Sequence, residues 1–494
     1  MACQSTKLEK PDVCVVGAGP AGMSVALTLG AAGRRVVLLE SGKFYSSGHD
    51  QKLNDGDHEG EPYAGLCRTR HRQVGGTANI WNVPVRGKPG AKYVPLSPRD
   101  VVGWPIGWTE LEPYYIEAQE LCGLGPFEYG ADYWATPSRR PFHLEGTGLT
   151  SGVYQFGLAE QFTTVLINRL RRNEAVTLVS SASVVELALD HGRRRVYKVR
   201  AVGARGKTIA VEARVVILAC GAVENTRLLL LAGLGNSGGS TWLGRGFMEH
   251  ARDFSLELVP ESPEIFASSS FYDLHVSQSG YLIGGRLALT DDAIESYQLP
   301  SASMTLVPSV RSRGPRKLVN RLSRSLRRFI GVPSPDRYGW SRIQSQAQVF
   351  DVFGIVLNLE QRSHPFNRIE LCGRRDRFGN RLPRLVLHWT DQEQAELEHL
   401  RQLVGEWFQA AKLGQLRTRI GHRPNLSAHH HAGTTRMATH PRDGVVNPDG
   451  RVFGLENLYL AGASVFPSAG SANPTLTVVA LALRLAQHIH SSLD

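Results

Sequence analysis

Paired cysteines, an acidic excess and long apolar runs are all missing from this 494-residue sequence. Its six cysteines stand singly and no CxxC pair occurs, so neither a zinc site nor a disulfide scaffold is expected. No apolar run reaches the roughly 18 residues that a bilayer-spanning helix needs, and no N-terminal segment has the pattern of a signal peptide. We therefore predict reduced thiols, no bound metal and a cytoplasmic location.

Acidic residues are the scarcer charge, 45 against 56 lysines and arginines, which gives a formal net charge of +11. The stretch Arg311–Arg328 is densely basic and contains no acid, and its leucines fall on one helical face. A helix at 316–330 could lie on a membrane or dock an acidic partner, or it could pack on its own domain as a solvated helix. No nucleic-acid-binding motif surrounds this run, so neither nucleic acid nor a membrane is an expected partner.

A glycine-rich turn lies between an apolar strand and a helix near the N-terminus. Asp12–Val16 predicts a buried parallel strand, Met23–Ala32 a helix, and Arg35–Leu39 a second strand that ends at Glu40. In such a unit the glycines permit a tight turn and close approach of a pyrophosphate, while the acid accepts hydrogen bonds from ribose hydroxyls. The pattern predicts dinucleotide binding by Gly17, Gly19, Pro20, Ala21, Gly22, Glu40 and Ser41. The alternative is a glycine-rich turn in another kind of α/β unit.

A second glycine-rich segment, Val74–Asn82, contains paired glycines that allow close backbone approach to a flat or charged ligand. Its candidate contacts are Gly75, Gly76, Thr77, Asn79, Ile80 and Trp81. The alternative is an ordinary loop around a buried tryptophan. Further along, we expect Thr109 to cap a helix that runs to about Cys122, with Pro113 in or near its first turn.

The middle of the chain returns to the strand–turn–helix pattern. Arg214–Ala219 predicts a buried strand, and the turn at Cys220-Gly221-Ala222 leads into a helix over Glu224–Ala232, with Ala219 and Gly221 at the turn. Upstream, two strands between Ala175 and Val199 are expected to pair around His191-Gly192, which puts Val184 near a ligand-binding edge. His250 is interpreted as structural rather than catalytic.

Residues 253–425 have a different pattern. The alternating segments Phe254–Val259, Ser301–Val307 and Val349–Leu359 predict an antiparallel sheet, and Gln392–Leu413 predicts one long helix. We expect this region to supply the substrate-side wall of a site.

Three consecutive histidines, His429, His430 and His431, open the C-terminal part of the chain. A strand-like segment, Asn457–Ala461, and a small-residue loop over Gly462–Ser471 follow. Asn473-Pro474 then precedes a helix predicted over Thr475–His488, whose free N–H groups suit an anionic ligand or an electron-rich ring. A titratable histidine and an amide beside such a loop predict a single site.

Together these motifs resemble the glucose–methanol–choline oxidoreductase family, most closely its pyranose-oxidase and bacterial sugar-dehydrogenase branch. The C-terminal block, His430–Thr477, carries the most specific part of the likeness, whereas residues 255–345 carry little. The other matching blocks are Val13–Glu40, Val74–Asn82, Trp104–Tyr115, Val215–Leu230, Gly244–His250 and Gln361–Gly379.

The resemblance implies an FAD-dependent enzyme that oxidises an alcohol to a carbonyl. His430 matches the family's catalytic base and Asn473 its second polar residue; a neutral imidazole is the natural acceptor of a hydroxyl proton near pH 7. Flavin N5 would accept the hydride. The resemblance also implies cofactor contacts at Gly462, Ala463, Asn473, Pro474 and Thr475. Ile80 stands where some members have a histidine that binds flavin covalently, so we predict non-covalent FAD.

We thus expect an α/β protein in which a Rossmann-like FAD-binding domain accompanies a substrate domain built on a mainly antiparallel sheet. The predicted boundaries are 11–90, 150–252 and 432–494 for the FAD-binding domain, 91–149 for a connecting or lid segment, and 253–431 for the substrate domain. The expected substrate is a secondary hydroxyl of a sugar or glycoside. The alternatives are a hydrophobic alcohol, which an aliphatic pocket wall would favour, and a non-redox lyase on the same fold. Oxygen, a quinone and a redox protein all stay open as electron acceptors.

Overall fold

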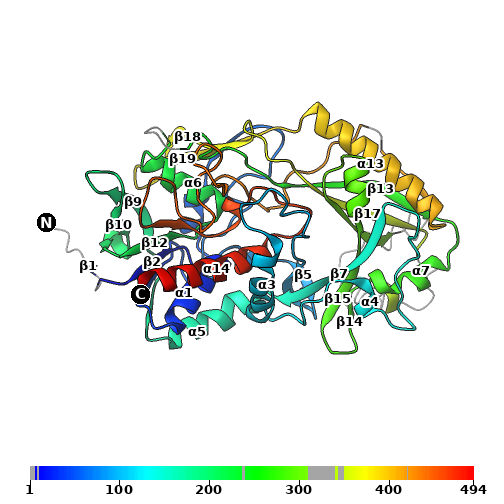
Figure 1. The fold of residues 1–494 in the computed structure, drawn as a ribbon, viewed down its shortest axis with the longest axis horizontal. Helices are drawn as coiled ribbons and strands as arrows, with labels where there is room; N and C mark the ends of the chain where they lie inside the picture. Colours follow the sequence, from blue (N-terminus) through cyan, green and yellow to red (C-terminus); the bar gives the residue numbers. More distant parts are fainter. Residues whose placement is uncertain (1–5, 8–9, 236–239, 310–339, 343–349, 420) are drawn as a thin grey trace.

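A computed structural model describes residues 6–7, 10–235, 240–309, 340–342, 350–419 and 421–494. Figure 1 shows two halves side by side along the long axis, with the parallel strands β2 and β12 in one half and the long strands β13 and β17 in the other. The predicted basic helix at 316–330 lies outside the described residues. Within the described parts of the chain, no helix is long and apolar enough to cross a membrane, and the five cysteines are free thiols.

The first half is organised by a five-stranded sheet in which every pairing is parallel. Its order is β21-β12-β2-β3-β8, with β2 at Val13–Val16, β3 at Val36–Leu39, β8 at Val176–Val179, β12 at Val215–Leu218 and β21 at Leu458–Leu460. The residues of β2, β3, β12 and β21 are buried, as parallel strands covered on both faces require. The predicted Rossmann-like fold is confirmed.

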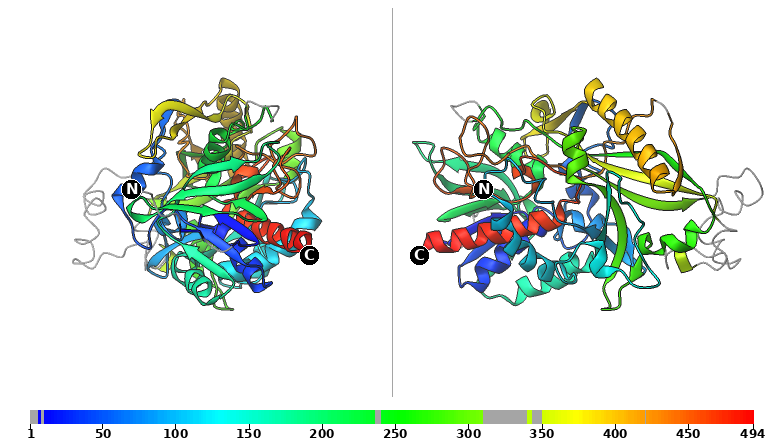
Figure 2. Two further views of the ribbon diagram at one scale, coloured as in Figure 1. Left: turned by 90° about the vertical axis from the view of Figure 1, so that its left-hand side faces the viewer. Right: turned by 45° about the vertical axis from the view of Figure 1, so that its right-hand side comes forward.

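Helices cover this sheet. They are α1 at Pro20–Ala31, α3 at Trp108–Cys122, α5 at Leu166–Arg172, α6 at Gly221–Leu231 and α14 at Thr475–Leu493. The C-terminal helix α14 lies alongside α1 in Figures 1 and 2 and is joined to α3 by a hydrogen bond of 2.8 Å between Tyr115 Oη and Thr477 Oγ1. The predicted cap at Thr109 is wrong, because α3 begins at Trp108 with Gly107 as its N-cap, two residues before the predicted cap, and Pro113 lies inside the helix.

The second half contains a nine-stranded sheet whose pairings are antiparallel. Its main path is β20-β13-β17-β16-β15-β7-β6-β5, and β14 pairs with β15. The bounds are β5 Val83–Val85, β6 Lys88–Tyr93, β7 Leu149–Leu158, β13 His250–Pro260, β14 His275–Val276, β15 Leu282–Leu289, β16 Ala302–Ser309, β17 Val352–Glu360 and β20 Gly414–Arg417. Strands β5 to β7 belong to this sheet, although they lie before residue 160 and so outside the predicted substrate domain, 253–431. The predicted domain boundaries stay a prediction.

The two faces of this sheet differ in chemistry because side chains alternate along each strand. Directly opposed residues share a face, and one face places His250 opposite Glu360 and Arg252 opposite Asn358, with Ser303 next to Asn358. The other face carries Val153, Leu287, Met304, Leu357 and Leu359, all buried. The same apolar cluster contains Leu400, Val404 and Phe408 of α13, which spans Asp391–Ala410 behind a capping box of Thr390 and Glu393.

Two smaller sheets complete the architecture. The hairpin of β9, Ser183–Leu189, and β10, Val196–Val202, confirms the predicted pairing around His191-Gly192, and it belongs to a sheet with β11, Thr208–Val211, and β1, Thr6–Lys7. The strand at residues 176–179 instead joins the parallel sheet beside β3. The other sheet contains β18, Arg368–Arg375, β19, Arg381–Leu387, and β4, Asp57–Gly60. Short helices lie at Gly48–Gln51 (α2), Ala131–Trp134 (α4), Ile265–Ser268 (α7) and Asp291–Ser296 (α8).

Candidate active site

A cavity of about 660 Å³ is lined by residues of both halves. Its wall includes the N-terminal glycine turn, the three consecutive histidines, the start of α14, and parts of β6 and β13. The cavity therefore joins the predicted dinucleotide-binding turn to the predicted catalytic histidine.

The glycine turn and Glu40 form one part of the wall. Gly17 has φ of +103°, and a Cβ there would lie 2.6 Å from the carbonyl oxygen of Ala219, so the turn admits no side chain. Glu40 is buried at the end of β3 and accepts backbone N–H groups of Ala18 at 2.8 Å and Gly42 at 2.7 Å. These contacts fix the Glu40 carboxyl beside the turn, where the fingerprint requires an acceptor for ribose hydroxyls.

Most of the predicted site residues are brought together on this wall. They are Gly17, Gly19, Pro20, Ala21, Glu40, Ser41, Gly76, Thr77, Ile80, Trp81, Val184, Ala219, Gly221, His430, Gly462, Ala463, Asn473, Pro474 and Thr475. Gly22 and Gly75 lie behind the wall, since a Cβ at Gly22 would lie 1.8 Å from the carbonyl oxygen of Gly17. Asn79 also lies off the wall and donates to the carbonyl oxygens of Val74 and Gly76, so it holds the loop rather than lining the cavity.

His430 and Asn473 lie within hydrogen-bond distance. The Nε2 atom of His430 is 3.2 Å from Nδ2 of Asn473, and the Nδ1 atom of His430 is 2.6 Å from Nδ1 of His250. On its far side, His250 Nε2 is 2.8 Å from the carbonyl oxygen of Gly470. A chain of three hydrogen bonds therefore runs from the amide through both imidazoles to the backbone.

The carbonyl oxygen of Gly470, at the end of this chain, fixes which atom donates and which accepts in each of the three hydrogen bonds. A carbonyl oxygen only accepts, so His250 Nε2 carries the proton and, in the neutral ring, His250 Nδ1 must accept. His430 Nδ1 then donates, which leaves a lone pair on His430 Nε2. The amide of Asn473 donates to that lone pair. The structure thus selects the His430 tautomer whose cavity-side nitrogen can accept a proton.

Both rings are neutral near pH 7. Burial lowers the pKa of His250 to about 4, partly opposed by its hydrogen bonds to the Gly470 loop. Burial, followed by the neighbouring His250 and the positive charges of Arg252 and Lys92, holds the pKa of His430 well below its usual range. A base that is unprotonated at the start of the reaction is what proton removal from an alcohol requires.

Glu249 fastens the histidine segment to β13. One carboxylate oxygen accepts the backbone N–H of His430 at 2.6 Å and of His250 at 3.1 Å, and the other accepts that of His429 at 2.9 Å. Tyr63 donates to the second oxygen at 3.2 Å. His429 has φ of +68°, an uncommon backbone conformation for a residue with a side chain, which these contacts hold in place. Both ends of the His250–His430 contact are therefore fixed by one carboxyl.

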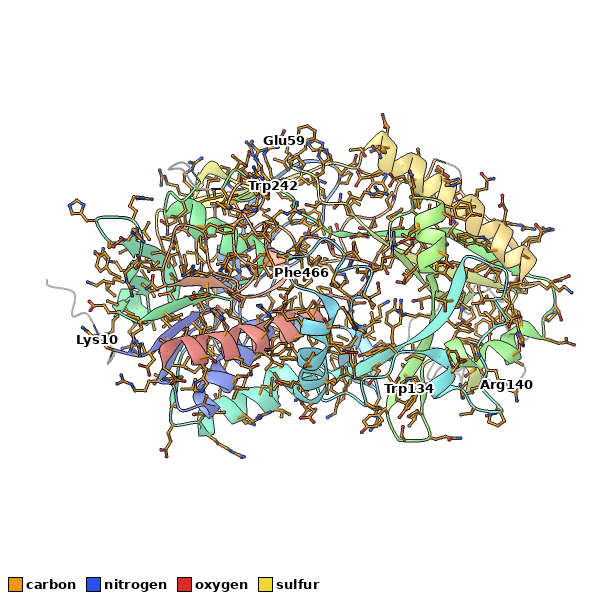
Figure 3. The ribbon with its side chains drawn as sticks, viewed as in Figure 1. Lys10, Glu59, Trp134, Arg140, Trp242 and Phe466 are labelled. Carbon is orange, nitrogen blue, oxygen red and sulfur yellow. The ribbon has the colours of Figure 1, made fainter. Side chains whose placement is uncertain are left out.

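The loop before α14 closes the other side. Phe466 of this loop lies near the middle of the molecule in Figure 3, fully buried and packed on Trp104 with ring centroids 5.2 Å apart. Beyond it, Asn473 precedes the first turn of α14, as predicted, and Pro474 is the N-cap. The Oδ1 atom of Asn473 is buried and has no hydrogen-bond partner in the described protein, so it is available to a bound molecule.

Several wall residues were missed by sequence reasoning, among them Lys92 on β6, Arg252 on β13 and Arg72 beside Ser41. His250 does not itself line the cavity but contacts the residue that does. Its position in the matched block Gly244–His250 was a usable signal. No local pattern singles out Lys92 or Arg252, because their position depends on strand pairing.

The residues present fit FAD. The cavity runs from Glu40 and the glycine turn to His430 and the N-terminus of α14. Gly19 and Gly76 face each other on its wall and have no side chains that would narrow it. The Oδ1 atom of Asn473, which has no hydrogen-bond partner in the described protein, offers an acceptor beside His430. Among the described residues, no group of three His, Cys, Asp or Glu side chains is arranged to hold a metal ion.

Comparison with known proteins agrees with this geometry. Residues 159–252 and 363–482 match the N- and C-terminal profiles described as GMC oxidoreductase, and residues 10–47 match an FAD binding domain. A 6'''-hydroxyparomomycin C oxidase of Streptomyces lividus and a paromamine 6'-oxidase of Streptomyces fradiae are each 25% identical, with 98% of this chain and 92% of theirs covered. A C-glycoside 3-oxidase of Microbacterium trichothecenolyticum is 36% identical over 122 residues, 22% of each chain.

Solved structures share the fold over the whole chain. Pyridoxine 4-oxidase from "Mesorbium loti" superposes with a TM-score of 0.57 at 17% identity, covering 98% of this chain and 99% of that one. A formate oxidase superposes with a TM-score of 0.57 at 16% identity, covering 99% of both chains. The chain belongs to the glucose–methanol–choline (GMC) oxidoreductase family and is an FAD-dependent oxidoreductase that acts on CH–OH groups.

Proposed function

We propose that the protein oxidises a secondary hydroxyl of a sugar or glycoside to a ketone, with His430 as the base. The polar face of the nine-stranded sheet supports this substrate class. Arg252, Asn358 and Ser303 share that face with His250, which contacts the base. Of these three side chains Arg252 lines the cavity, where Lys92, His429 and Asn473 also make the wall polar. A polar wall suits a polyhydroxylated substrate, whereas a lipid alcohol needs an aliphatic wall. A relative named for a glycoside, the C-glycoside 3-oxidase, points the same way.

The chain's own residues can position and deprotonate such a hydroxyl. The substrate hydroxyl donates to the lone pair on His430 Nε2, and Asn473 Nδ2 turns its donation from that nitrogen to the hydroxyl oxygen. His430 then holds the proton at Nε2 while its Nδ1–H stays bonded to His250, so the ring does not rotate as it charges. Bound FAD supplies the acceptor for the hydride of the carbinol carbon. The backbone N–H groups at the start of α14 face the same region and favour negative charge there.

Cofactor attachment and electron acceptor are further parts of the proposal. Ile80 lies on the cavity wall at the position of covalent attachment in some relatives and has no nucleophilic atom, so FAD is bound non-covalently. Acid precipitation should then release the flavin into the supernatant. Comparing oxygen, a quinone and an electron-transfer protein in reoxidation of the reduced enzyme identifies the acceptor. A cytoplasmic location stays a prediction from the sequence.

An anaerobic titration tests the function directly. Purified holoenzyme is mixed with glucose, a methyl glucoside, a sterol and a simple primary alcohol, and bleaching of the flavin is followed. We expect bleaching by the sugars. Bleaching only by the sterol or the primary alcohol would refute the sugar assignment, and bleaching by none of them would favour a lyase on this fold.

The role of His430 is tested in the same assay. His430→Ala should still bind FAD, but reduction of its flavin by the substrate should be about 10²–10⁴-fold slower, the usual effect of losing a general base. His422→Ala is the matched control, because that side chain is exposed and does not line the cavity. An unchanged rate in His430→Ala would move the base to His429 or His431.

A further inference from the structure

Two cations line the cavity near His430 without an acidic partner. Lys92 lies on β6, with Nζ 4.1 Å from the ring centroid of Tyr154, and Arg252 lies on β13. Among the described residues, no carboxylate oxygen lies within 4 Å of the charged nitrogens of either side chain. Other buried arginines do have such partners, for example Arg401 with Asp253 at 2.9 Å and Arg70 with Glu224 at 2.8 Å. The fold itself therefore does not neutralise these two cavity-lining charges through an ion pair.

Strand pairing puts both cations on the polar face. Arg252 is opposite Asn358, whose Nδ2 donates to the carbonyl oxygen of Ser471 at 2.7 Å, in the loop that leads to Asn473. Lys92 is opposite Phe156, and Tyr154 is two residues away on the same face. The two cations thus come from strands at opposite sides of the sheet, and both lie close enough to His430 to lower its pKa. They are placed at the base, where the substrate must lie.

A third cation extends this arrangement. Arg286 on β15 shares the polar face and lies with its guanidinium carbon 5.6 Å from the Tyr154 ring centroid. Its Nε is buried and has no hydrogen-bond partner among the described residues. Arg286 does not line the cavity, so it adds positive charge to the polar face rather than a contact to a bound molecule.

Two buried carboxyls of this region, Glu249 and Glu360, do not supply the missing negative charge. Glu249 interacts electrostatically with Arg252, but its two oxygens are occupied by backbone N–H groups and Tyr63. Glu360 accepts the backbone N–H of Gly470 in the same region. Burial raises the pKa of both carboxyls to about 7, so neither is a full counter-charge at neutral pH. The substrate side of the cavity is therefore electropositive.

We propose that the substrate carries an oxyanion, a carboxylate or a phosphate, which Arg252 and Lys92 bind while its hydroxyl lies at His430. This inference rests on the proposed oxidation of a sugar hydroxyl. A planar guanidinium binds two oxygens of such a group at once, and an ammonium adds a point charge. A sugar bearing an ammonium group is repelled from the same wall.

Four matched sugars test the charge preference. Glucose, glucuronate, glucose 6-phosphate and glucosamine are compared as reductants of the flavin under anaerobic conditions, by the second-order rate constant of bleaching. We expect one of the two anions to exceed glucose about 10–100-fold, the range of a charge-assisted hydrogen bond, and glucosamine to be slowest. The faster anion identifies the oxyanion as carboxylate or phosphate. Equal rates for all four sugars would overturn the proposal.

A binding probe separates this inference from the oxidation itself. Tetrahydropyran-2-carboxylate has no CH–OH group, so it cannot reduce the flavin, but it should perturb the flavin spectrum on binding and compete with the preferred sugar. Saturable binding of this probe when no sugar bleaches the flavin would support the anion site and refute sugar oxidation. If glucose bleaches the flavin but the probe does not bind, sugar oxidation is supported and the anion site is refuted.

Variants assign the effect to the two cations. Arg252→Gln and Lys92→Gln should each lose most of the anion preference, measured as the ratio of the anion rate to the glucose rate in the same variant, and weaken probe binding about tenfold or more. Lys88→Gln is the matched control on the same strand, because Lys88 is exposed and pairs with Glu160. Equal slowing of glucose and the anion in both variants would mean that the cations act on the flavin or on His430, and would overturn the assignment.

Discussion

Replacement of His250 tests whether a buried second imidazole decides which nitrogen of His430 acts as the base. In His250→Ala, the Nδ1–H of His430 loses the acceptor that lies 2.6 Å away. His430 can then move its proton to Nε2 and use Nδ1 as the free nitrogen, which points away from Asn473. The variant should therefore shift His430 toward the unproductive tautomer without removing it.

The size of the effect follows from the bond that is lost. An unsatisfied buried donor costs about 1–3 kcal/mol, and here the cost falls only on the productive tautomer. Since each 1.4 kcal/mol is about a tenfold change in population, flavin reduction should slow about 10–100-fold, with FAD and substrate dissociation constants close to wild type. Stopped-flow reduction by the preferred substrate measures this rate.

His250→Gln distinguishes positioning from packing. The glutamine oxygen can accept from His430 Nδ1–H while its amide nitrogen donates to Gly470, so the rate should recover to within a few-fold of wild type. If the alanine and glutamine variants are equally slow, with the same loss of thermal stability, His250 acts only by filling space. If His250→Ala reduces its flavin as fast as wild type, the assigned direction of the hydrogen-bond chain is wrong.

Three further predictions follow from the same contacts. Asn473→Ala should retain FAD and slow flavin reduction about 10–100-fold through loss of the donor to the hydroxyl oxygen, and a change in FAD affinity alone would contradict that role. Glu40→Ala should weaken FAD binding about tenfold or more, measured by flavin fluorescence on dialysis, because it removes the carboxyl held beside the glycine turn; unchanged affinity would remove Glu40 from the cofactor site. Burial raises the pKa of Glu249 from 4.5 to about 7, so the unfolded chain releases this proton first as pH rises. Relative to Glu249→Gln, the free energy of unfolding of the wild type should fall by up to a few kcal/mol between pH 4.5 and 7 and then level off, and a constant difference across that window would show ordinary ionisation.

The sequence predicted those parts of the fold that are specified locally. The βαβ unit from Val13 to Glu40 was found because a glycine turn, an apolar strand and a terminal acid are neighbours in the chain. The start of α14 after Asn473 was found for the same reason. The N-cap of α3 was missed because Thr109 has a favourable capping side chain, whereas the helix begins at Trp108 after a glycine.

The rest depends on pairings between distant residues. The strand β8 belongs beside β3, more than a hundred residues earlier, and no pattern within its four residues distinguishes it from the neighbouring hairpin. His250 was interpreted as structural because its contact with His430 arises only when β13 and the histidine segment are both held by Glu249. Family resemblance named the base, but only the contacts with Gly470 and His250 show which of its nitrogens is free.

Because side chains alternate between the two faces of the nine-stranded sheet, different residues serve core packing and substrate contact. Residues such as Leu357, Met304 and Leu287 stabilise the packing against α13, while the opposite face of the sheet carries Arg252 and Lys92 of the cavity wall. A substitution at Arg252 or Lys92 can therefore alter what the enzyme accepts without opening a void in the hydrophobic interior. Such a surface lets substrate preference change one side chain at a time, while the base His430 and the stability of the fold are unaffected.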